Sequence, residues 1–183
     1  MKDFSGWSLF LDRDGVINQR IIDGYVTRPE DFILIDGVLD AIRTFTQVFS
    51  HIFIVTNQQG IGKGLMTDDD LSLVHSTFVK EVEAHGGRID KIYYCPKLKS
   101  EHSFDRKPRI GMALKARKDF PDVRFRQSVM IGDSKTDMEF GKHAGMTTVL
   151  VGDEPQIARQ NPRLVDYCYP TLFDFCRELR IEN

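Results

Sequence analysis

Two aspartates near the N-terminus could carry out chemistry on a phosphate group. Asp12 and Asp14 are separated by one residue and follow the apolar run at 8–11. If the chain is still extended there, both carboxylates face the same side and repel each other, so one is expected to hold a proton or both to share a cation. An aspartate can also attack phosphorus and form an aspartyl-phosphate. The pair therefore predicts a metal-assisted site for phosphoryl transfer.

Electrostatic repulsion determines what else such a site needs. Two unit charges about 3.5 Å apart cost roughly 5 kcal/mol at an effective dielectric of about 20, and a phosphate dianion beside a carboxylate roughly doubles that cost. Asp133, after the apolar run at 129–131, could join Asp12 and a backbone carbonyl in binding Mg²⁺, which prefers oxygen ligands. Lys107, within Arg106-Lys107-Pro108, could supply a further positive charge. Taken alone, such an acid is more often a helix cap, and such a basic tripeptide is more often a solvated loop.

Alternating short apolar runs and amphipathic segments indicate how these residues are positioned. Strands are expected at 8–11, 51–55, 89–95, 129–131, 148–151 and 165–169. Helices are expected at 37–50, from Thr67 past residue 82, at 110–119, at 135–144 and from 171 to 179. Strands separated by helices imply right-handed βαβ units and a parallel sheet, whose ligands bind at the carboxyl ends of the strands. Asp12, Thr56 and Asp133 are therefore expected to meet at one edge.

Four segments, in this order, resemble the haloacid dehalogenase (HAD) superfamily. Asp12-Arg13-Asp14-Gly15-Val16 is similar to its first motif, Thr56 to the second-motif hydroxyl residue, Lys107 to the third-motif lysine, and Gly132–Asp137 to the fourth motif. The resemblance implies an α/β fold: a three-layer, Rossmann-like parallel sheet with helices on both faces. It also implies one HAD-like domain over residues 1–183, without a cap domain, because the gaps between motifs are too short for one.

The same resemblance implies a role for each motif residue. Asp12 would be the nucleophile and Asp14 the general acid and base. Thr56 would hydrogen-bond the phosphoryl oxygens, and Lys107 would neutralise charge. Mg²⁺ would be held by Asp12, the backbone carbonyl of Asp14 and Asp133. The sequence is thus interpreted as that of a phosphatase, a phosphoric monoester hydrolase.

Further segments resemble the heptose bisphosphate phosphatase group within the superfamily. They cover most of residues 8–155 and include Asp14–Asn18, Gly24-Tyr25-Val26, Ile35–Val38, Val55–Gly64, Tyr93–Pro96 and Arg106-Lys107-Pro108. The implied substrate is a sugar phosphate, D-glycero-D-manno-heptose 1,7-bisphosphate, which would lose its 7-phosphate. Substrate-binding residues would be Asn18, Asn57, Gln58 and Arg106. Histidinol-phosphate phosphatases share much of this pattern, so histidinol phosphate or another small metabolite is the alternative substrate.

One departure from this group concerns a zinc-binding loop. The group usually carries three cysteines and a histidine between the segments matched by Tyr93–Pro96 and Arg106-Lys107-Pro108, but here only Cys95 is present. Lys97 stands near the expected histidine, and Asp105 stands where a cysteine is expected. His102 cannot complete a tetrahedral site alone. No structural Zn²⁺ is expected, and the altered loop leaves the identity of the substrate open.

Composition limits the remaining possibilities. Lys plus Arg is 25 and Asp plus Glu is 27, which gives a formal net charge of −2 and no overall attraction to nucleic acid. No apolar run approaches the roughly 18 residues of a membrane span, and the N-terminal run is cut by Asp12, unlike a signal peptide. Three scattered cysteines are typical of a reduced, cytoplasmic protein. A monomer acting on a small molecule is expected.

Two other classes of protein remain as alternatives. A receiver-like signalling domain also stores an aspartyl-phosphate on a parallel sheet, but it usually pairs adjacent acids. A binding protein with decayed catalysis is the other alternative, although no catalytic residue is missing. Among individual residues, Asp137 is expected to support the site without binding the metal, with direct binding as the alternative. Phe173 is expected in the core, Cys168 and Cys176 as buried thiols, and His75 facing solvent.

Overall fold

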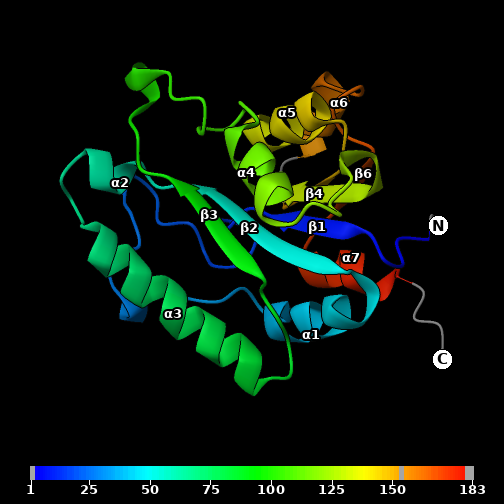
Figure 1. Ribbon diagram of the computed structural model, residues 1–183, viewed down its shortest axis with the longest axis horizontal. Coiled ribbons are helices and arrows are strands. Elements are labelled where there is room, and N and C mark those ends of the chain that lie inside the picture. The colour runs from blue at the N-terminus through cyan, green and yellow to red at the C-terminus, as the bar shows by residue number, and fades with distance from the viewer. Residues whose placement is uncertain (1–2, 153–154, 180–183) are drawn as a thin grey trace.

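Short apolar runs form one six-stranded parallel sheet in the computed structural model, which describes residues 3–152 and 155–179 (Figure 1). The strand order is β3-β2-β1-β4-β5-β6, and each neighbouring pair is parallel. The strands are β1 (Ser8–Leu11), β2 (His51–Asn57), β3 (Lys91–Cys95), β4 (Ser128–Gly132), β5 (Thr147–Val151) and β6 (Tyr167–Tyr169). The predicted parallel α/β sheet is confirmed, and the predicted strand ranges differ from the observed ones by at most two residues at either end.

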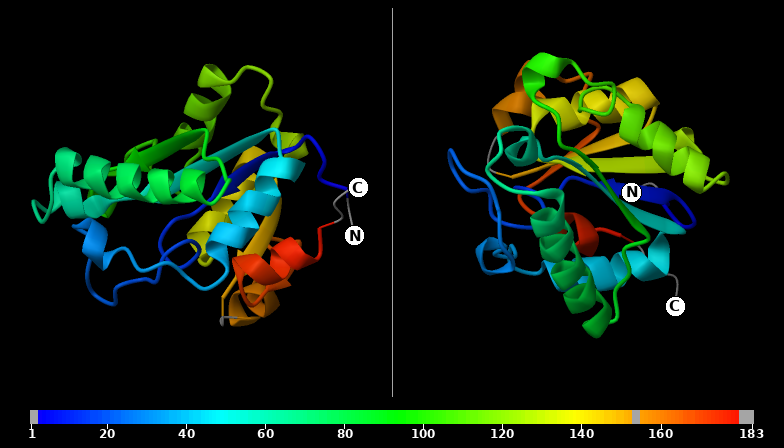
Figure 2. Two further views of the ribbon diagram at one scale, coloured as in Figure 1. Left: turned by 90° about the horizontal axis from the view of Figure 1, so that it is seen from below. Right: turned by 60° about the vertical axis from the view of Figure 1, so that its left-hand side comes forward.

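Helices cover both faces of this sheet (Figures 1 and 2). On one face lie α1 (Val38–Val48), α3 (Asp68–Ala84) and α7 (Leu172–Arg177); on the other lie α4 (Gly111–Asp119) and α5 (Lys135–Ala144). The remaining short elements are α2 (Gln59–Gly62), α6 (Pro155–Gln160) and the 3₁₀ turns Pro29–Asp31, Lys99–Glu101 and Phe125–Gln127. The predicted three-layer arrangement is therefore confirmed.

Alternation along the strands builds a separate core on each face. Leu9 and Leu11 belong to the core beneath α1, α3 and α7, whereas Phe10 belongs to the core beneath α4 and α5. All three side chains are fully buried, as expected for a strand that is covered on both sides. Phe10 packs against Phe53 of β2, with ring centroids 5.1 Å apart. Burial of β1 on both faces fixes the point at which the chain leaves the sheet, directly before Asp12.

The helix α3 begins as the sequence predicts. The hydroxyl of Thr67 accepts a hydrogen bond from the backbone N–H of Asp70 at 3.1 Å, and the Asp70 carboxylate accepts one from the backbone N–H of Thr67 at 2.8 Å. This reciprocal pair satisfies two N–H groups that a helix end leaves free. The cap therefore fixes the start of α3, the helix that carries His75.

The order of the strands sets the position of the functional edge. From β1 the chain proceeds to β2 and β3 on one side, and β4, β5 and β6 follow on the other side. The topology therefore reverses between β1 and β4, which are direct neighbours. Ligands of such sheets bind beyond the carboxyl ends of the strands at this reversal. Asp12 follows β1 and Asp133 follows β4, so both lie at this point.

The connections that follow β1 (residues 12–37) and β2 (residues 58–90) contain three regular elements. Between β1 and α1 the described chain forms one 3₁₀ turn, and between β2 and β3 it forms α2 and α3.

Two predictions of burial were wrong. Phe173 is 36% exposed because it lies on the outer side of α7, against Gly37, and Cys168 is exposed on β6, which has one neighbouring strand. Cys176 is buried as predicted. None of the helices in the described ranges has both the length and the apolar character that a membrane span requires.

Candidate active site

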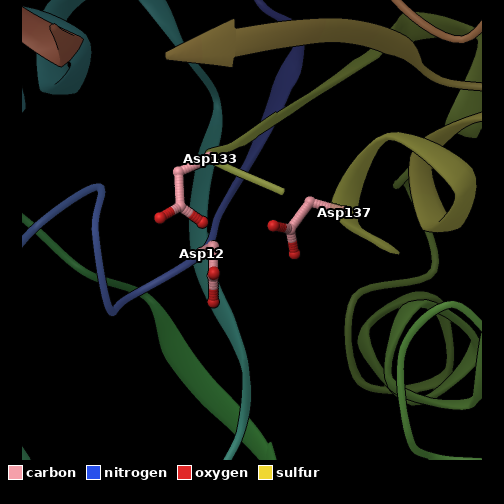
Figure 3. A group of neighbouring side chains, drawn as sticks. All are labelled: Asp12, Asp133 and Asp137. Carbon is pink, nitrogen blue, oxygen red and sulfur yellow. The ribbon is translucent and has the colours of Figure 1, made fainter. Parts of the chain in front are cut away.

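Three carboxylates converge at the carboxyl ends of β1 and β4. Asp12, Asp133 and Asp137, the last from the first turn of α5, each offer one oxygen, and these oxygens lie within 4.8 Å of one another (Figure 3). Two glycines make this approach possible. A Cβ on Gly15 would lie 1.8 Å from the Asp133 carboxylate, and a Cβ on Gly132 would lie 2.2 Å from the Cβ of Asp137. The glycines of both acidic motifs are therefore required by space.

A buried lysine lies between two of these carboxylates. The Nζ of Lys107 is 2.7 Å from Asp12 Oδ1 and 2.6 Å from Asp137 Oδ1. Burial alone would lower the lysine pKa, but the two carboxylates outweigh it and raise that pKa, so the ammonium stays charged. Asn57 holds the lysine backbone from both sides, with its Oδ1 accepting from Lys107 N at 3.1 Å and its Nδ2 donating to Lys107 O at 3.3 Å. The lysine is thus positioned through its backbone and its side chain.

Electrostatic crowding at this site favours a divalent cation. Burial, followed by the charge of Asp137, raises the pKa of Asp12 to about 6 despite the neighbouring lysine. Burial and the charge of Asp12 raise the pKa of Asp133 to about 7. Oxygen-only donors of high negative charge are the ligands that Mg²⁺ prefers. The residues present therefore fit that ion, whose charge would relieve the repulsion between them.

The second aspartate of the first motif has a different environment. Asp14 Oδ1 accepts from Arg13 Nη2 at 3.0 Å and from Asn18 Nδ2 at 3.0 Å, and its Oδ2 accepts from Gln58 Nε2 at 2.9 Å. Burial would raise the pKa of Asp14, but the Arg13 charge and these hydrogen bonds hold it below its usual value. We expected Asn18 and Gln58 to line the substrate site. Instead both are buried behind Asp14 and hold its carboxylate in place, outside the wall of the cavity.

Arg13 connects this carboxylate to α3. Its guanidinium is fully buried, and its Nη1 lies 3.1 Å from Nε2 of His75. Burial, followed by the charge of Arg13, lowers the pKa of His75 to about 3, so the imidazole is neutral and accepts the hydrogen bond. The prediction that His75 faces solvent was wrong. Its spacing of four residues from Leu71, on the apolar side of the helix, was the signal that could have identified its burial.

A cavity of about 300 Å³ opens beside these residues. Of the predicted site residues, it is lined by Asp12, Asp14, Thr56, Asn57, Arg106 and Lys107. Thr56 Oγ1 accepts a hydrogen bond from Gln58 Nε2 at 2.8 Å, which fixes the hydroxyl at the cavity wall. Asp133 lines a neighbouring cavity instead.

Sequence reasoning missed several lining residues on the segment after β1. Arg20, Ile21 and Tyr25 line the same cavity, together with Gln59 of α2. The Tyr25 hydroxyl accepts from Gln59 Nε2 at 2.9 Å, and the ring lies 5.3 Å from the Lys63 ammonium. These contacts attach the segment to α2, so it forms one wall of the site.

The altered loop before Lys107 contains polar contacts at positions where the resemblance implies zinc ligands. Arg106 Nη1 donates to the backbone carbonyl of Lys97 at 3.1 Å, and Lys115 Nζ lies 2.6 Å from Asp105 Oδ2. Arg109 also donates to the carbonyl of His102. A hydrogen bond therefore joins the two ends of the loop, and an ion pair attaches the loop to α4.

Comparisons with known proteins agree with this geometry. A HAD-hydrolase-like family model matches residues 104–171. The D,D-heptose 1,7-bisphosphate phosphatase of B. bronchiseptica, solved with magnesium and phosphate, superposes with a TM-score of 0.85 at 29% identity, over 94% of this chain and 97% of that one. Fold and site thus define a phosphatase of the HAD superfamily.

Sequence relatives narrow this assignment. The D-glycero-alpha-D-manno-heptose-1,7-bisphosphate 7-phosphatase of Campylobacter jejuni is 41% identical over 147 residues, covering 80% of this chain and 83% of the relative. The corresponding beta-anomer phosphatase of Haemophilus influenzae is 33% identical over 180 residues, covering 94% of this chain and 96% of the relative. The chain belongs to this family of heptose-1,7-bisphosphate 7-phosphatases.

Proposed function

We propose that this phosphatase removes the 7-phosphate of D-glycero-D-manno-heptose 1,7-bisphosphate and uses Mg²⁺ as its cofactor. One observation carries the proposal: Asp12 lines the cavity beside the Lys107 ammonium, and its carboxylate is within reach of Asp133, which follows β4. The names of the relatives support the substrate, and the magnesium and phosphate of the structural neighbour support the cofactor.

Asp12 is proposed as the nucleophile. Its carboxylate oxygen forms a bond to phosphorus as the bond from phosphorus to the sugar oxygen breaks, which leaves an aspartyl-phosphate. Lys107, fixed 2.7 Å from Asp12, reduces the repulsion between the two anions. Thr56 offers its hydroxyl to the phosphoryl oxygens from the cavity wall. Mg²⁺, held by Asp12, the Asp14 carbonyl and Asp133, would supply further positive charge to the phosphate.

Asp14 is proposed to move the protons. It gives a proton to the departing sugar oxygen, then takes one from the water that hydrolyses the aspartyl-phosphate. The free site keeps Asp14 ionised, but an incoming phosphate dianion raises its proton affinity, so Asp14 takes up a proton from solvent before it donates one. Three donors, from Arg13, Asn18 and Gln58, prevent the carboxylate from turning away during these steps. Asp137, bonded to Lys107 and Ser134, is proposed to orient the lysine without binding the metal.

Asp12→Asn tests the nucleophile assignment directly. Phosphate release from heptose 1,7-bisphosphate should fall by at least about 10³-fold, because an amide cannot form the phosphorylated intermediate. The control is Asp69→Asn, an exposed acid in the first turn of α3, which should retain wild-type activity. Undiminished release by Asp12→Asn would refute the assignment. Comparison of both heptose anomers with histidinol phosphate then identifies the substrate, and a phosphoenzyme lasting minutes would favour the receiver-like alternative.

Arg106 and Asn57 are proposed to contact the substrate, because both line the cavity. We also propose that residues 1–183 form a single domain and that the protein acts as a cytoplasmic monomer. Light scattering coupled to gel filtration measures the oligomeric state, and a dimeric mass would contradict the proposed monomer.

A further inference from the structure

An arginine from the segment after β1 contacts the oxygens to which the metal is assigned. Arg20 Nη2 lies 2.7 Å from Asp133 Oδ1 and 3.4 Å from the backbone carbonyl oxygen of Asp14. In the proposed function, these two residues and Asp12 hold Mg²⁺. The inference below rests on that metal site. The guanidinium therefore lies at the oxygens that a divalent cation would need.

Arg20 also borders two hollows of the molecular surface. It lines the substrate cavity, where Asp12 lies, and it lines the neighbouring cavity, where Asp133 lies. The arginine therefore already reaches the cavity in which it would remain after leaving Asp133.

Elementary electrostatics sets the relation between the arginine and the ion. The guanidinium is always charged, and a Mg²⁺ ion bound to the same carboxylate would repel it. The Arg20 side chain is 54% exposed and lies outside helices and strands, so it can leave Asp133 without disturbing the core. Lys107, by contrast, is buried and held by two carboxylates. Arg20 is therefore freer to move than Lys107.

We propose that Arg20 and the divalent cation compete for the Asp133 carboxylate. Without metal, Arg20 neutralises Asp133 and keeps the three carboxylates compatible with the fold. When the ion binds, the guanidinium leaves Asp133 and stays within the substrate cavity that it already lines. Arg20 is thus a positioning residue that sets the affinity of the metal site.

Binding of Mn²⁺, measured without substrate from the EPR signal of the free ion, tests the proposal. Arg20→Gln removes the competing charge, and the dissociation constant should fall roughly two- to fivefold, the range expected for a partly exposed ion pair. Arg20→Lys keeps a cation and should remain within about twofold of the wild type. The control, Arg28→Gln, removes an exposed arginine of the same segment, whose nearest acid is Asp31 at 3.6 Å, and should leave binding unchanged.

Unchanged or weaker binding by Arg20→Gln would overturn the proposal and leave the metal site intact. Failure of the metal site itself gives a different result: Asp133→Asn would then bind Mn²⁺ as well as the wild type does. Absence of Mn²⁺ binding in the wild type would overturn both. Higher ionic strength gives a second check, because it weakens exposed ion pairs and should reduce the difference between wild type and Arg20→Gln.

Discussion

Replacement of the buried lysine should destabilise the protein far more than replacement of an exposed one. At an effective dielectric of about 20, each of the two carboxylates attracts the Lys107 ammonium by about 6 kcal/mol, given distances of 2.7 and 2.6 Å. Most of that attraction offsets the desolvation of the buried charges. Lys107→Met leaves Asp12 and Asp137 buried without a cation, which costs about 3–5 kcal/mol. For a chain of this length, the melting temperature should fall by about 6–20 °C.

Lys115 supplies a matched control. Its ammonium is also 2.6 Å from a carboxylate, that of Asp105, but the two side chains are 53% and 32% exposed. Lys115→Met should therefore cost at most about 1 kcal/mol, or less than about 4 °C. Thermal unfolding of both variants in EDTA, which removes metal ions, gives the comparison. Equal losses in the two variants would refute the reasoning that burial makes the Lys107 pairs strong.

The loss in Lys107→Met should also depend on pH. The pKa of Asp12 is already raised to about 6 with the ammonium present, and it rises further without that charge. At pH 5 the carboxyl is then neutral and needs no partner, whereas at pH 8 it must either ionise without a partner or hold its proton against the solution pH, and both cost free energy. The variant should lose more stability at pH 8 than at pH 5. A loss that is independent of pH would show that packing, and not charge, is responsible.

Three further predictions concern glycine, metal and acid stability. Gly15→Ala should lower activity about 100-fold, because the added methyl group displaces Asp133. Gly64→Ala is the control: this glycine also has a positive φ, but a Cβ there would meet no atom within 4 Å, so the variant should remain active. Equal rates in the two variants would contradict this. Mg²⁺ at about 100 times its dissociation constant should stabilise the metal-free protein by about 2.7 kcal/mol, seen as a rise of about 5–11 °C in differential scanning fluorimetry; no rise would contradict the metal site. Burial would raise the pKa of Asp166, but the hydrogen bonds from Lys142 and from the backbone of Thr148 hold that pKa below its usual value. The Asp166→Asn variant should therefore be less stable than the wild type at pH 7. In urea unfolding, that difference should narrow as pH falls below about 4, and a constant difference would exclude the charge.

The elements that carry the motifs were predictable because their signals are local. The apolar run before Asp12 ends at a charged residue, so the end of β1 is visible in the sequence. Alternation of strands and helices then implies a parallel sheet, and a parallel sheet brings the ends of β1, β2 and β4 to one edge. That reasoning brings Asp12 and Thr56 together, and both line the cavity.

Contacts between distant segments were less predictable. The pairing of Arg20 with Asp133 joins residues 113 positions apart, and neither lies in a pattern that indicates the other. Asn18 and Gln58 carry amides that could bind a sugar equally well, and only the three-dimensional arrangement shows that both donate to Asp14. The contact of His75 with Arg13 joins residues 62 positions apart, and the long arginine side chain makes it by reaching α3. Side chains that act through another side chain require the folded structure to be found.

The central place of β1 has a consequence for how the protein is made. This strand leaves the ribosome first, yet one of its two neighbours, β4, begins only at Ser128. During synthesis, the proposed nucleophile Asp12 therefore lacks Asp133 and Asp137 until the final third of the chain has been made. In a truncated product that ends before Ser128, β1 forms the edge of the sheet because β4 is missing, and Asp133 and Asp137 are missing too. Such a product should have no phosphatase activity. Onset of phosphatase activity would therefore report that translation has passed β4 and α5.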